Sequence, residues 1–131
     1  IQAAALNVKL RFLRDWTSKR RMIANEYQTR IKNNKIELSF ETSYNYHVYH
    51  IFSLFYKNRV SLRNYLTKNE IGINFHYPVP AHLQKPYHNL GYKRGDFPVT
   101  ETISNSQISI PIFPEMKKNE IDYVIKIINN F

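Results

Sequence analysis

The sequence lacks several residues on which protein chemistry often depends. It contains no cysteine, so a disulfide framework and thiol chemistry are excluded. Its three glycines, Gly72, Gly91 and Gly95, do not form a phosphate-binding loop. No apolar run approaches the roughly 20 residues of a membrane-spanning helix, and no signal peptide is visible. We therefore predict a cytoplasmic protein without a membrane partner.

Acidic residues are also scarce: 10 Asp and Glu stand against 19 Lys and Arg, for a formal net charge of +9. Between Ile1 and Lys35 the only acids are Asp15 and Glu26. A basic helix of this kind can bind nucleic acid or an acidic membrane surface. The basic positions are not interleaved with aromatic side chains, as they are in a single-strand binder. We interpret them as a solvated helix face and do not expect nucleic acid as a partner.

The size and composition of the chain predict one folded domain. A length of 131 residues is enough to bury a core, and the contents of 43% hydrophobic and 15% aromatic residues exclude a disordered chain. No internal repeat or long linker divides the sequence, so we predict a single domain over residues 1–131. The expected fold is α/β in the broad sense (α+β), with a small, mainly antiparallel sheet packed against helices.

The first 32 residues predict one long helix that leads this fold. An apolar stripe recurs at helical spacing, through Ala3, Leu6, Leu10, Leu13, Ile23, Tyr27 and Ile31. No glycine or proline interrupts the stripe, and a break near Thr17 and Ser18 is an open alternative. The chain begins at Ile1, without Met and inside this pattern, which we take to indicate an excised fragment.

The rest of the chain predicts short strands that alternate with helices. The expected strands cover residues 35–40, 47–56, 71–75 and 108–112. The expected helices cover residues 60–68, 81–90 with an interruption at Pro86, 99–107, and a last segment whose buried stripe is Ile121, Val124, Ile125 and Ile128. The strand over 47–56 is apolar on both alternating faces, as in a strand covered on both sides. Its His47 and His50 would lie on opposite faces and could not bind one metal.

Residues 70–87 carry the candidate site. His76 and Tyr77 end a strand-like run and are followed by Pro78 and Pro80, which restrict the backbone. An imidazole and a phenol on a stiff turn can meet a ligand with little entropy left to lose. The alternative reading is a proline-rich surface turn with one satisfied histidine.

The chain offers no complete catalytic arrangement of its own. It has no cysteine nucleophile, no His-x-x-His pair and no paired carboxylates at metal spacing. Among its histidines, only His76 and His82 lie in a plausible site. Ser109 stands between isoleucines with no visible base. We expect no catalytic residue, cofactor ligand or metal ligand in this chain.

Three stretches nevertheless resemble one family when they are taken in order. IGINFHYPVPAHLQKPYHNLGYKRGDFP, residues 71–98, resembles the His-Tyr-Pro and His-Leu-Gln region of the DegT/DnrJ/StrS family. Residues 1–31 look like the long helix of that family, with its Gln-Ala-Ala opening and Arg-Arg-x-Ile-Ala centre. Residues 108–128, ISIPIFPEMKKNEIDYVIKII, look like its closing signature. The family comprises pyridoxal-phosphate-dependent aminotransferases that act on nucleotide sugars.

The resemblance implies that the chain is the small C-terminal domain of a fold-type-I aminotransferase. The parent would transfer an amino group from glutamate to a keto-deoxy nucleotide sugar, in surface-polysaccharide or antibiotic sugar biosynthesis. It would use pyridoxal phosphate and form a homodimer. The lysine that holds the cofactor would lie upstream of Ile1, so the fragment alone should be inactive and bind no cofactor. His76, Tyr77 and His82 would face the nucleotide sugar.

Two other classes remain open at this point. One is a basic nucleic-acid-binding module, and the other is a structural interaction module. A steep loss of DNA affinity with rising salt would favour the first of them. The sequence does not identify the sugar or which carbon, C3 or C4, receives the amino group.

Overall fold

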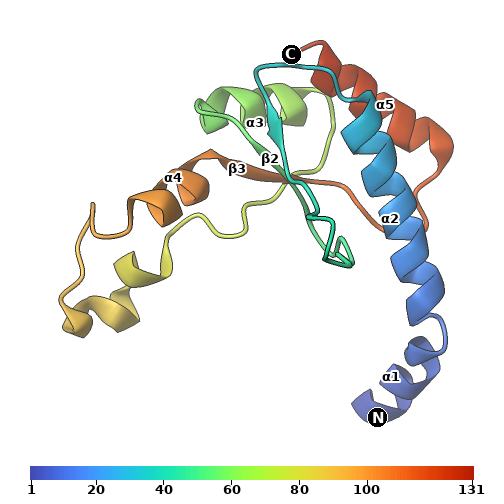
Figure 1. Cartoon of the computed structure of the whole chain (residues 1–131), viewed down its shortest axis with the longest axis horizontal. Coiled ribbons are helices and arrows are strands. Elements are labelled where there is room, and N and C mark those ends of the chain that lie inside the picture. The colour runs from blue at the N-terminus through green and yellow to red at the C-terminus, as the bar shows by residue number, and fades with distance from the viewer. The chain divides into compact units, whose positions relative to one another are not determined.

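The computed structural model describes all of residues 1–131, and its internal contacts group them into two compact units. The first unit comprises Ile1–Asn33, Phe40–Phe52 and Pro111–Phe131, and the second comprises Asn34–Ser39 and Ser53–Ile110. The first unit contains helices α2 (Leu13–Arg30) and α5 (Lys118–Asn129) (Figure 1). The second unit contains helices α3 (Arg59–Lys68) and α4 (Pro98–Ser106) and strand β3 (Gln107–Ile110). None of the helices combines the length and apolar character needed to cross a membrane.

The N-terminal helix is interrupted, so the prediction of one helix over residues 1–32 is wrong. Helix α1 spans Gln2–Leu10 and α2 spans Leu13–Arg30. Between them the amides of Arg11 and Phe12 donate to Val8 and Lys9, three residues back, which tightens the last turn of α1. The alternative break near Thr17 and Ser18 is also wrong, because both residues lie inside α2.

Helix α1 buries none of its side chains. Leu6, Val8 and Leu10 are all more than half exposed. The aromatic ring of Phe12 stacks on Trp16, with ring centroids 5.9 Å apart, at the start of α2. The apolar stripe predicted from the sequence therefore has no cover over its first three turns within this chain.

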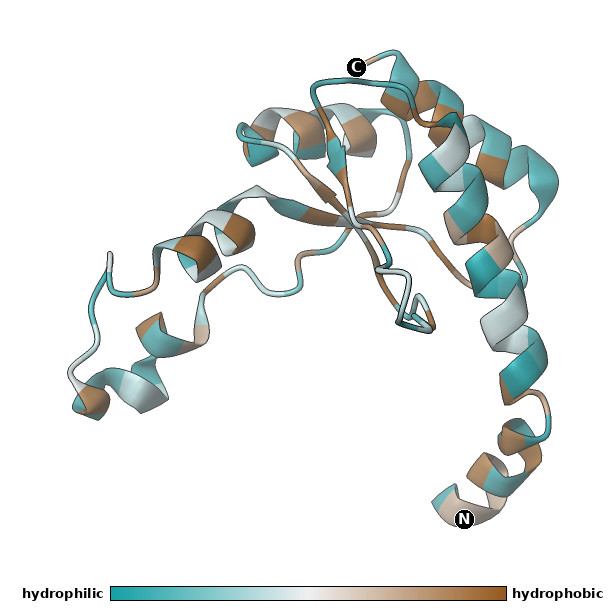
Figure 2. Cartoon of the chain, in the orientation of Figure 1, coloured by the Kyte–Doolittle hydropathy of each residue, from teal (hydrophilic) through white to brown (hydrophobic).

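The core of the first unit forms where α2 packs on α5, Lys118–Asn129. Helix α2 contributes Ile23, Ala24 and Tyr27, and the predicted stripe of α5 is confirmed, with Ile127 buried as well. Figure 2 shows hydrophobic and hydrophilic positions alternating along α5, as one buried face requires. The fully buried Tyr27 ring meets Phe52 edge-on at 5.2 Å, and its hydroxyl donates to the Pro111 carbonyl at 2.8 Å.

The predicted strand over residues 47–56 is shorter than expected. Only Phe52–Phe55 form a strand, β2. Its Ser53 and Phe55 are half-buried, so one face of the strand is only partly covered by other residues. The preceding residues bond to arginines of α2 instead of to a neighbouring strand: Arg21 donates to the carbonyl of His47, and Arg20 to that of Val48. His47 and His50 consequently lie outside any strand, and not on opposite faces of one.

Arg21 holds the loop of residues 41–47, before β2, through its charge as well as through hydrogen bonds. Its guanidinium forms a two-pronged pair with Glu41, at 2.7 and 3.0 Å, and lies 4.1 Å from the centre of the Tyr46 ring. The backbone amide of His47 also donates to Glu41. These contacts with Arg21 and His47 lower the pKa of the Glu41 carboxyl.

The sheet has three strands in the order β1-β2-β3, in agreement with the predicted small antiparallel sheet. Strand β1, Glu37–Leu38, runs antiparallel to β2 and pairs Leu38 with Leu54. All four residues of β3, Gln107–Ile110, are buried. Helix α3, Arg59–Lys68, packs against β3 and buries Leu62 and Leu66, which confirms the predicted helix over 60–68.

The predicted strand over residues 71–75 is reduced to one antiparallel bridge between Asn74 and Ser109. The reason lies in the next two amides, which donate to side chains: Phe75 to Asn74 Oδ1, and His76 to Gln107 Oε1. The predicted helix over 81–90 is instead two 3₁₀ helices, η1 (Ala81–Leu83) and η2 (Lys85–Leu90). Helix α4, Pro98–Ser106, is confirmed near its predicted bounds and leads directly into β3.

Candidate functional site

His76 is anchored to the buried strand β3. Its backbone amide donates to Gln107 Oε1 at 2.9 Å, and its ring nitrogen Nδ1 lies 2.7 Å from Ser109 Oγ. The other ring nitrogen, Nε2, lies 3.5 Å from the amide nitrogen of Asn74. The side chain is half-buried, with one edge of the imidazole fixed by β3 and the other near the surface.

Ser109 and Gln107 form a buried polar network beneath His76. Both residues are less than a tenth exposed. The amide nitrogen of Gln107 donates to Ser109 Oγ at 2.6 Å and to Ser53 Oγ at 2.9 Å. The sequence shows neither the partner of Ser109 nor the role of Gln107, because His76 lies more than thirty residues away along the chain.

This serine–histidine contact is not a nucleophilic pair. Ser109 is buried beneath His76, with 6% of its surface exposed, and its oxygen already accepts a hydrogen bond from Gln107. A serine nucleophile needs access to a substrate carbonyl and an imidazole oriented by a third group. The network instead orients the imidazole. A ligand would contact the other ring nitrogen, Nε2.

Tyr77 combines a fixed backbone with an exposed side chain. Its carbonyl accepts a hydrogen bond from Ser104 Oγ of α4 at 2.7 Å, and the His76–Tyr77 peptide is cis. Tyr77 is 71% exposed, and its ring meets the His76 ring edge-on at 5.6 Å. His76 and Tyr77 are thus brought together, as the sequence predicted, with their outer edges available to a ligand.

His82 lies in a different environment from the other two predicted site residues. Its side chain is buried, its Nε2 lies 3.2 Å from Glu101 Oε1 of α4, and its ring is 4.8 Å from that of Phe97. The same Glu101 oxygen accepts the amide of Gly95 at 2.7 Å. Gly95 has φ +98, a conformation that side chains rarely adopt, so glycine is required there.

Electrostatics favour the ionised form of Glu101. The hydrogen bond from the Gly95 amide, followed by the one from His82, holds the pKa of this carboxyl below its ordinary value, against the opposing effect of burial. The contact ties η1, the loop before α4 and α4 together. His82 is therefore placed to hold this segment in position.

Ser104 connects Tyr77 to a further arginine that sequence reasoning missed. While its hydroxyl donates to Tyr77, its carbonyl accepts Arg59 Nη1 at 2.5 Å. The Arg59 guanidinium also lies 4.4 Å from the centre of the Phe75 ring. The cation at the start of α3 therefore contacts the side chain that precedes His76 and the serine that bonds to Tyr77.

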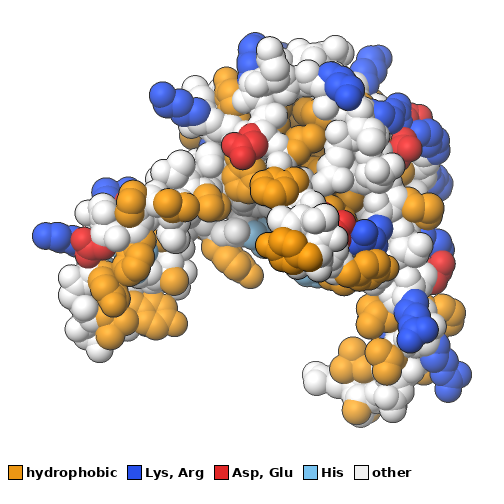
Figure 3. Space-filling view, in the orientation of Figure 1, with side chains coloured by type: hydrophobic (Ala, Val, Ile, Leu, Met, Phe, Trp, Pro, Cys, Tyr) orange, Lys and Arg blue, Asp and Glu red, His pale blue; other side chains and the backbone are white.

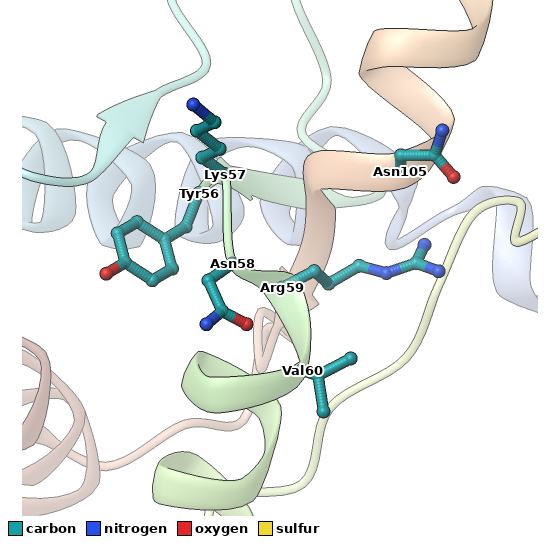
Figure 4. Close-up of a pocket in the computed structure, with 6 residues that line it drawn as sticks. All are labelled: Tyr56, Lys57, Asn58, Arg59, Val60 and Asn105. Atoms are coloured by element: carbon teal, nitrogen blue, oxygen red, sulfur yellow. The ribbon is translucent and has the colours of Figure 1, made fainter.

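A groove of about 680 Å³ lies beside this arginine (Figure 4). It is lined by Tyr56, Lys57, Asn58, Arg59, Val60 and Asn105. Asn58 accepts the amide of Ser61 and so caps α3. Arg59 is held by Ser104 and Phe75, and no carboxylate or histidine lines the groove. It therefore provides no group suited to acid–base chemistry near neutral pH.

The residues of this chain do not fit a complete site for pyridoxal phosphate. Every lysine lies at the surface, and all but Lys19 are exposed. Lys19 is half-buried and pairs with Asp15 at 2.9 Å. None lines a buried cavity opposite an aspartate that could meet the nitrogen of a pyridine ring. No group of three or more histidine, aspartate or glutamate side chains is placed to hold a metal ion.

Comparison with known proteins decides the family. The model of the DegT/DnrJ/EryC1/StrS aminotransferase family matches residues 1–129. The chain belongs to this family. Its membership does not favour the alternatives of a nucleic-acid-binding or a purely structural module.

The sequence relatives of this family member include a dTDP-sugar transaminase and a protein of erythromycin biosynthesis. The dTDP-3-amino-3,6-dideoxy-alpha-D-galactopyranose transaminase of Aneurinibacillus thermoaerophilus is 37% identical over the whole chain, which covers 36% of that protein. The erythromycin biosynthesis sensory transduction protein EryC1 of Saccharopolyspora erythraea is 38% identical over 95% of the chain and 34% of its own length. The chain thus spans about a third of the length of the curated relatives it matches.

The fold is shared with solved enzymes of the family. The crystal structure of S. venezuelae DesV in complex with a ketimine intermediate superimposes with a TM-score of 0.95 at 29% identity, over 98% of this chain and 35% of DesV. The α+β fold of a C-terminal aminotransferase portion is therefore confirmed.

Proposed function

We propose that this chain is the C-terminal part of a sugar-nucleotide aminotransferase and that it presents His76 and Tyr77 to the nucleotide sugar. The observation that carries the proposal is the anchoring of His76. One imidazole edge is fixed by the buried β3 network, the other edge makes only the exposed contact with Asn74, and Tyr77 is exposed. Two prearranged polar groups of this kind suit an oxygen-rich ligand.

The parent protein transfers an amino group from glutamate to a keto-deoxy nucleotide sugar. Bound pyridoxal phosphate supplies the electron sink for such a transfer. The residues that hold this cofactor belong to a part of the protein outside this chain, whereas His76 and Tyr77 bind and orient the sugar. We also propose that the parent is a homodimer in the cytoplasm.

Three findings support this function. The family model covers nearly the whole chain, a relative at 37% identity is a dTDP-sugar transaminase, and DesV shares the fold while holding a ketimine intermediate. The glutamate donor and the keto-deoxy nucleotide-sugar class of the acceptor rest on the family resemblance.

His82 has a more indirect part in the proposal. Its assignment to substrate binding remains a prediction, and its bond to Glu101 supports a positioning role. By holding η1 against α4, it would fix the segment that follows Tyr77. Loss of His82 would then alter substrate affinity through the placement of this segment.

The test is His76→Ala in the full-length enzyme, with the two half-reactions measured separately. A hydrogen bond to a charged group contributes roughly 1.5–3 kcal/mol, so the half-reaction with the nucleotide sugar should weaken on the order of ten- to a hundredfold. The half-reaction with glutamate should be nearly unchanged.

His50→Ala is the matched control, because His50 is exposed and lies outside the site. It should leave both half-reactions and the melting temperature unchanged. If His76→Ala instead weakened both half-reactions equally and lowered the melting temperature strongly, His76 would be a packing residue and the proposal would fail.

A further inference from the structure

The orientation of the Gln107 side chain is fixed by its contact with the backbone. The amide of His76 can only donate, so the Gln107 atom that meets it at 2.9 Å must be the oxygen. The nitrogen of the same side chain then faces Ser109 Oγ and Ser53 Oγ. An amide nitrogen only donates, so Ser109 Oγ accepts from Gln107.

This leaves the hydroxyl hydrogen of Ser109 to be placed. Ser109 is 6% exposed, and a buried hydroxyl without an acceptor is costly. The acceptor at hydrogen-bond distance is His76 Nδ1, at 2.7 Å. Ser109 can donate to Nδ1 only if that nitrogen carries no hydrogen, and in a neutral imidazole the hydrogen then resides on Nε2.

We infer that Gln107 and Ser109 are positioning residues that set the tautomer of His76 and so make its outer nitrogen, Nε2, a hydrogen-bond donor. The fitting ligand atom is an acceptor oxygen, such as a diphosphate oxygen of a nucleotide sugar. The choice of ligand rests on the proposed function, whereas the tautomer rests on the buried network alone.

One contact opposes this assignment and is weaker. Asn74 Oδ1 accepts the amide of Phe75 at 2.8 Å, which turns the Asn74 amide nitrogen toward His76 Nε2 at 3.5 Å. That distance is at the limit of a hydrogen bond, and the Asn74 amide is exposed and can donate to water. The Ser109 hydroxyl is buried and has no such choice, so the 2.7 Å contact decides the tautomer.

The direct test is nitrogen NMR of the histidine rings of this chain above the pH at which they lose their charge. His76 should show a single tautomer with hydrogen on Nε2, while the exposed His50 in the same spectrum should show an average of both. In Ser109→Ala, His76 should move to the averaged pattern of His50. Ser109→Thr, which restores a hydroxyl, should recover the single tautomer.

The control is Ser106→Ala, because the Ser106 hydroxyl bonds only to carbonyls within α4. It should leave the His76 signals unchanged. Hydrogen on Nδ1 in the unmodified chain would overturn the inference, and this measurement does not depend on any variant folding. An unchanged tautomer in a folded Ser109→Ala variant would overturn it as well.

A second arm separates this inference from the proposed function. In the full-length enzyme, Ser109→Ala should raise the KM for the nucleotide sugar roughly tenfold, equivalent to one ordinary hydrogen bond, and leave the half-reaction with glutamate intact. A confirmed tautomer without any effect on KM would support the network and contradict substrate binding by His76. An unchanged substrate KM together with hydrogen on Nδ1 would contradict both.

Discussion

Two regions of the chain are stabilised in different ways. One is the packed pair of helices α2 and α5, and the other is the segment from His76 to Ser106. Between α2 and α5, stability comes from buried apolar side chains around Tyr27. In the segment, every residue from 84 to 100 is exposed, including large apolar ones such as Leu90 and Val99, and Figure 3 shows hydrophobic side chains gathered on the surface. The backbone there is fixed by a few hydrogen bonds, from the Ser104 hydroxyl to the Tyr77 carbonyl and from the Gly95 amide to the Glu101 carboxylate.

This difference indicates that the α2–α5 core provides stability, whereas the segment from His76 to Ser106 provides groups for binding. A region stabilised by many apolar contacts tolerates little change and presents little to a ligand. A region held by a few directed hydrogen bonds keeps its polar and aromatic groups available, and each contact can be removed singly. The proposed substrate surface lies in the second kind of region.

The largest effect is expected from Phe52→Ala, in the core around Tyr27. Phe52 is fully buried against Tyr27, so its loss should lower the free energy of unfolding by about 3–5 kcal/mol. Chemical denaturation measures this change. Phe40→Ala removes the same ring from a position that is 78% exposed and should change stability by less than about 0.5 kcal/mol. Equal losses in the two variants would contradict the assignment of the core.

A smaller effect is expected from Tyr27→Phe, which keeps the ring and removes the hydroxyl. The lost bond to the Pro111 carbonyl should cost about 1 kcal/mol of unfolding free energy. Tyr44→Phe is the control, because Tyr44 is 86% exposed. A loss as large as that of Phe52→Ala would mean that the hydroxyl, rather than the ring, dominates at this position.

The segment offers a pH-dependent test through Glu101. Its pKa is lowered by the bonds from Gly95 and His82, so the stabilisation is present above the ordinary carboxyl pKa and is lost as the pH falls through the lower folded value. The amide proton shift of Gly95 should therefore titrate in acid, with a midpoint below the ordinary glutamate value.

Glu101→Gln should abolish that titration while the core signals of α5 stay in place. Glu115→Gln, in the exposed turn before α5, should leave it unchanged. A Gly95 midpoint above the ordinary glutamate value would contradict the assigned contact.

The smallest effect is expected when pyridoxal phosphate is added to this chain alone. Since its lysines lie at the surface without a built site, no specific complex should form. Absorbance titration followed by borohydride treatment measures this. Stoichiometric labelling of one lysine of the chain would contradict the assignment of the cofactor site to another part of the protein.

The regular elements with a strong apolar pattern could be predicted from the sequence. Helix α3 and the buried stripe of α5 follow from their spacing, because burial on one face imposes that spacing. The break at Arg11 and Phe12 could not be predicted, since neither glycine nor proline marks it. The shortening of β2 also escaped prediction, because it depends on Arg20 and Arg21, which lie in a distant helix.

The candidate site was also predicted only in part, because sequence patterns indicate local features but not contacts between distant residues. His76 and Tyr77 are adjacent in the sequence and precede two prolines, so their presentation on a turn could be anticipated. Their support from Gln107, Ser109 and Ser104 could not, because these contacts join residues that are far apart in the chain. The burial of His82 against Glu101 likewise emerges only in three dimensions.

The central claim is that the outer edges of His76 and Tyr77 meet the nucleotide sugar. A crystal structure of the full-length enzyme with the nucleotide sugar bound tests it most directly. We expect His76 Nε2 or the Tyr77 hydroxyl to lie within about 3.2 Å of a substrate oxygen. A substrate bound with neither group in reach, directly or through one water, would contradict the claim.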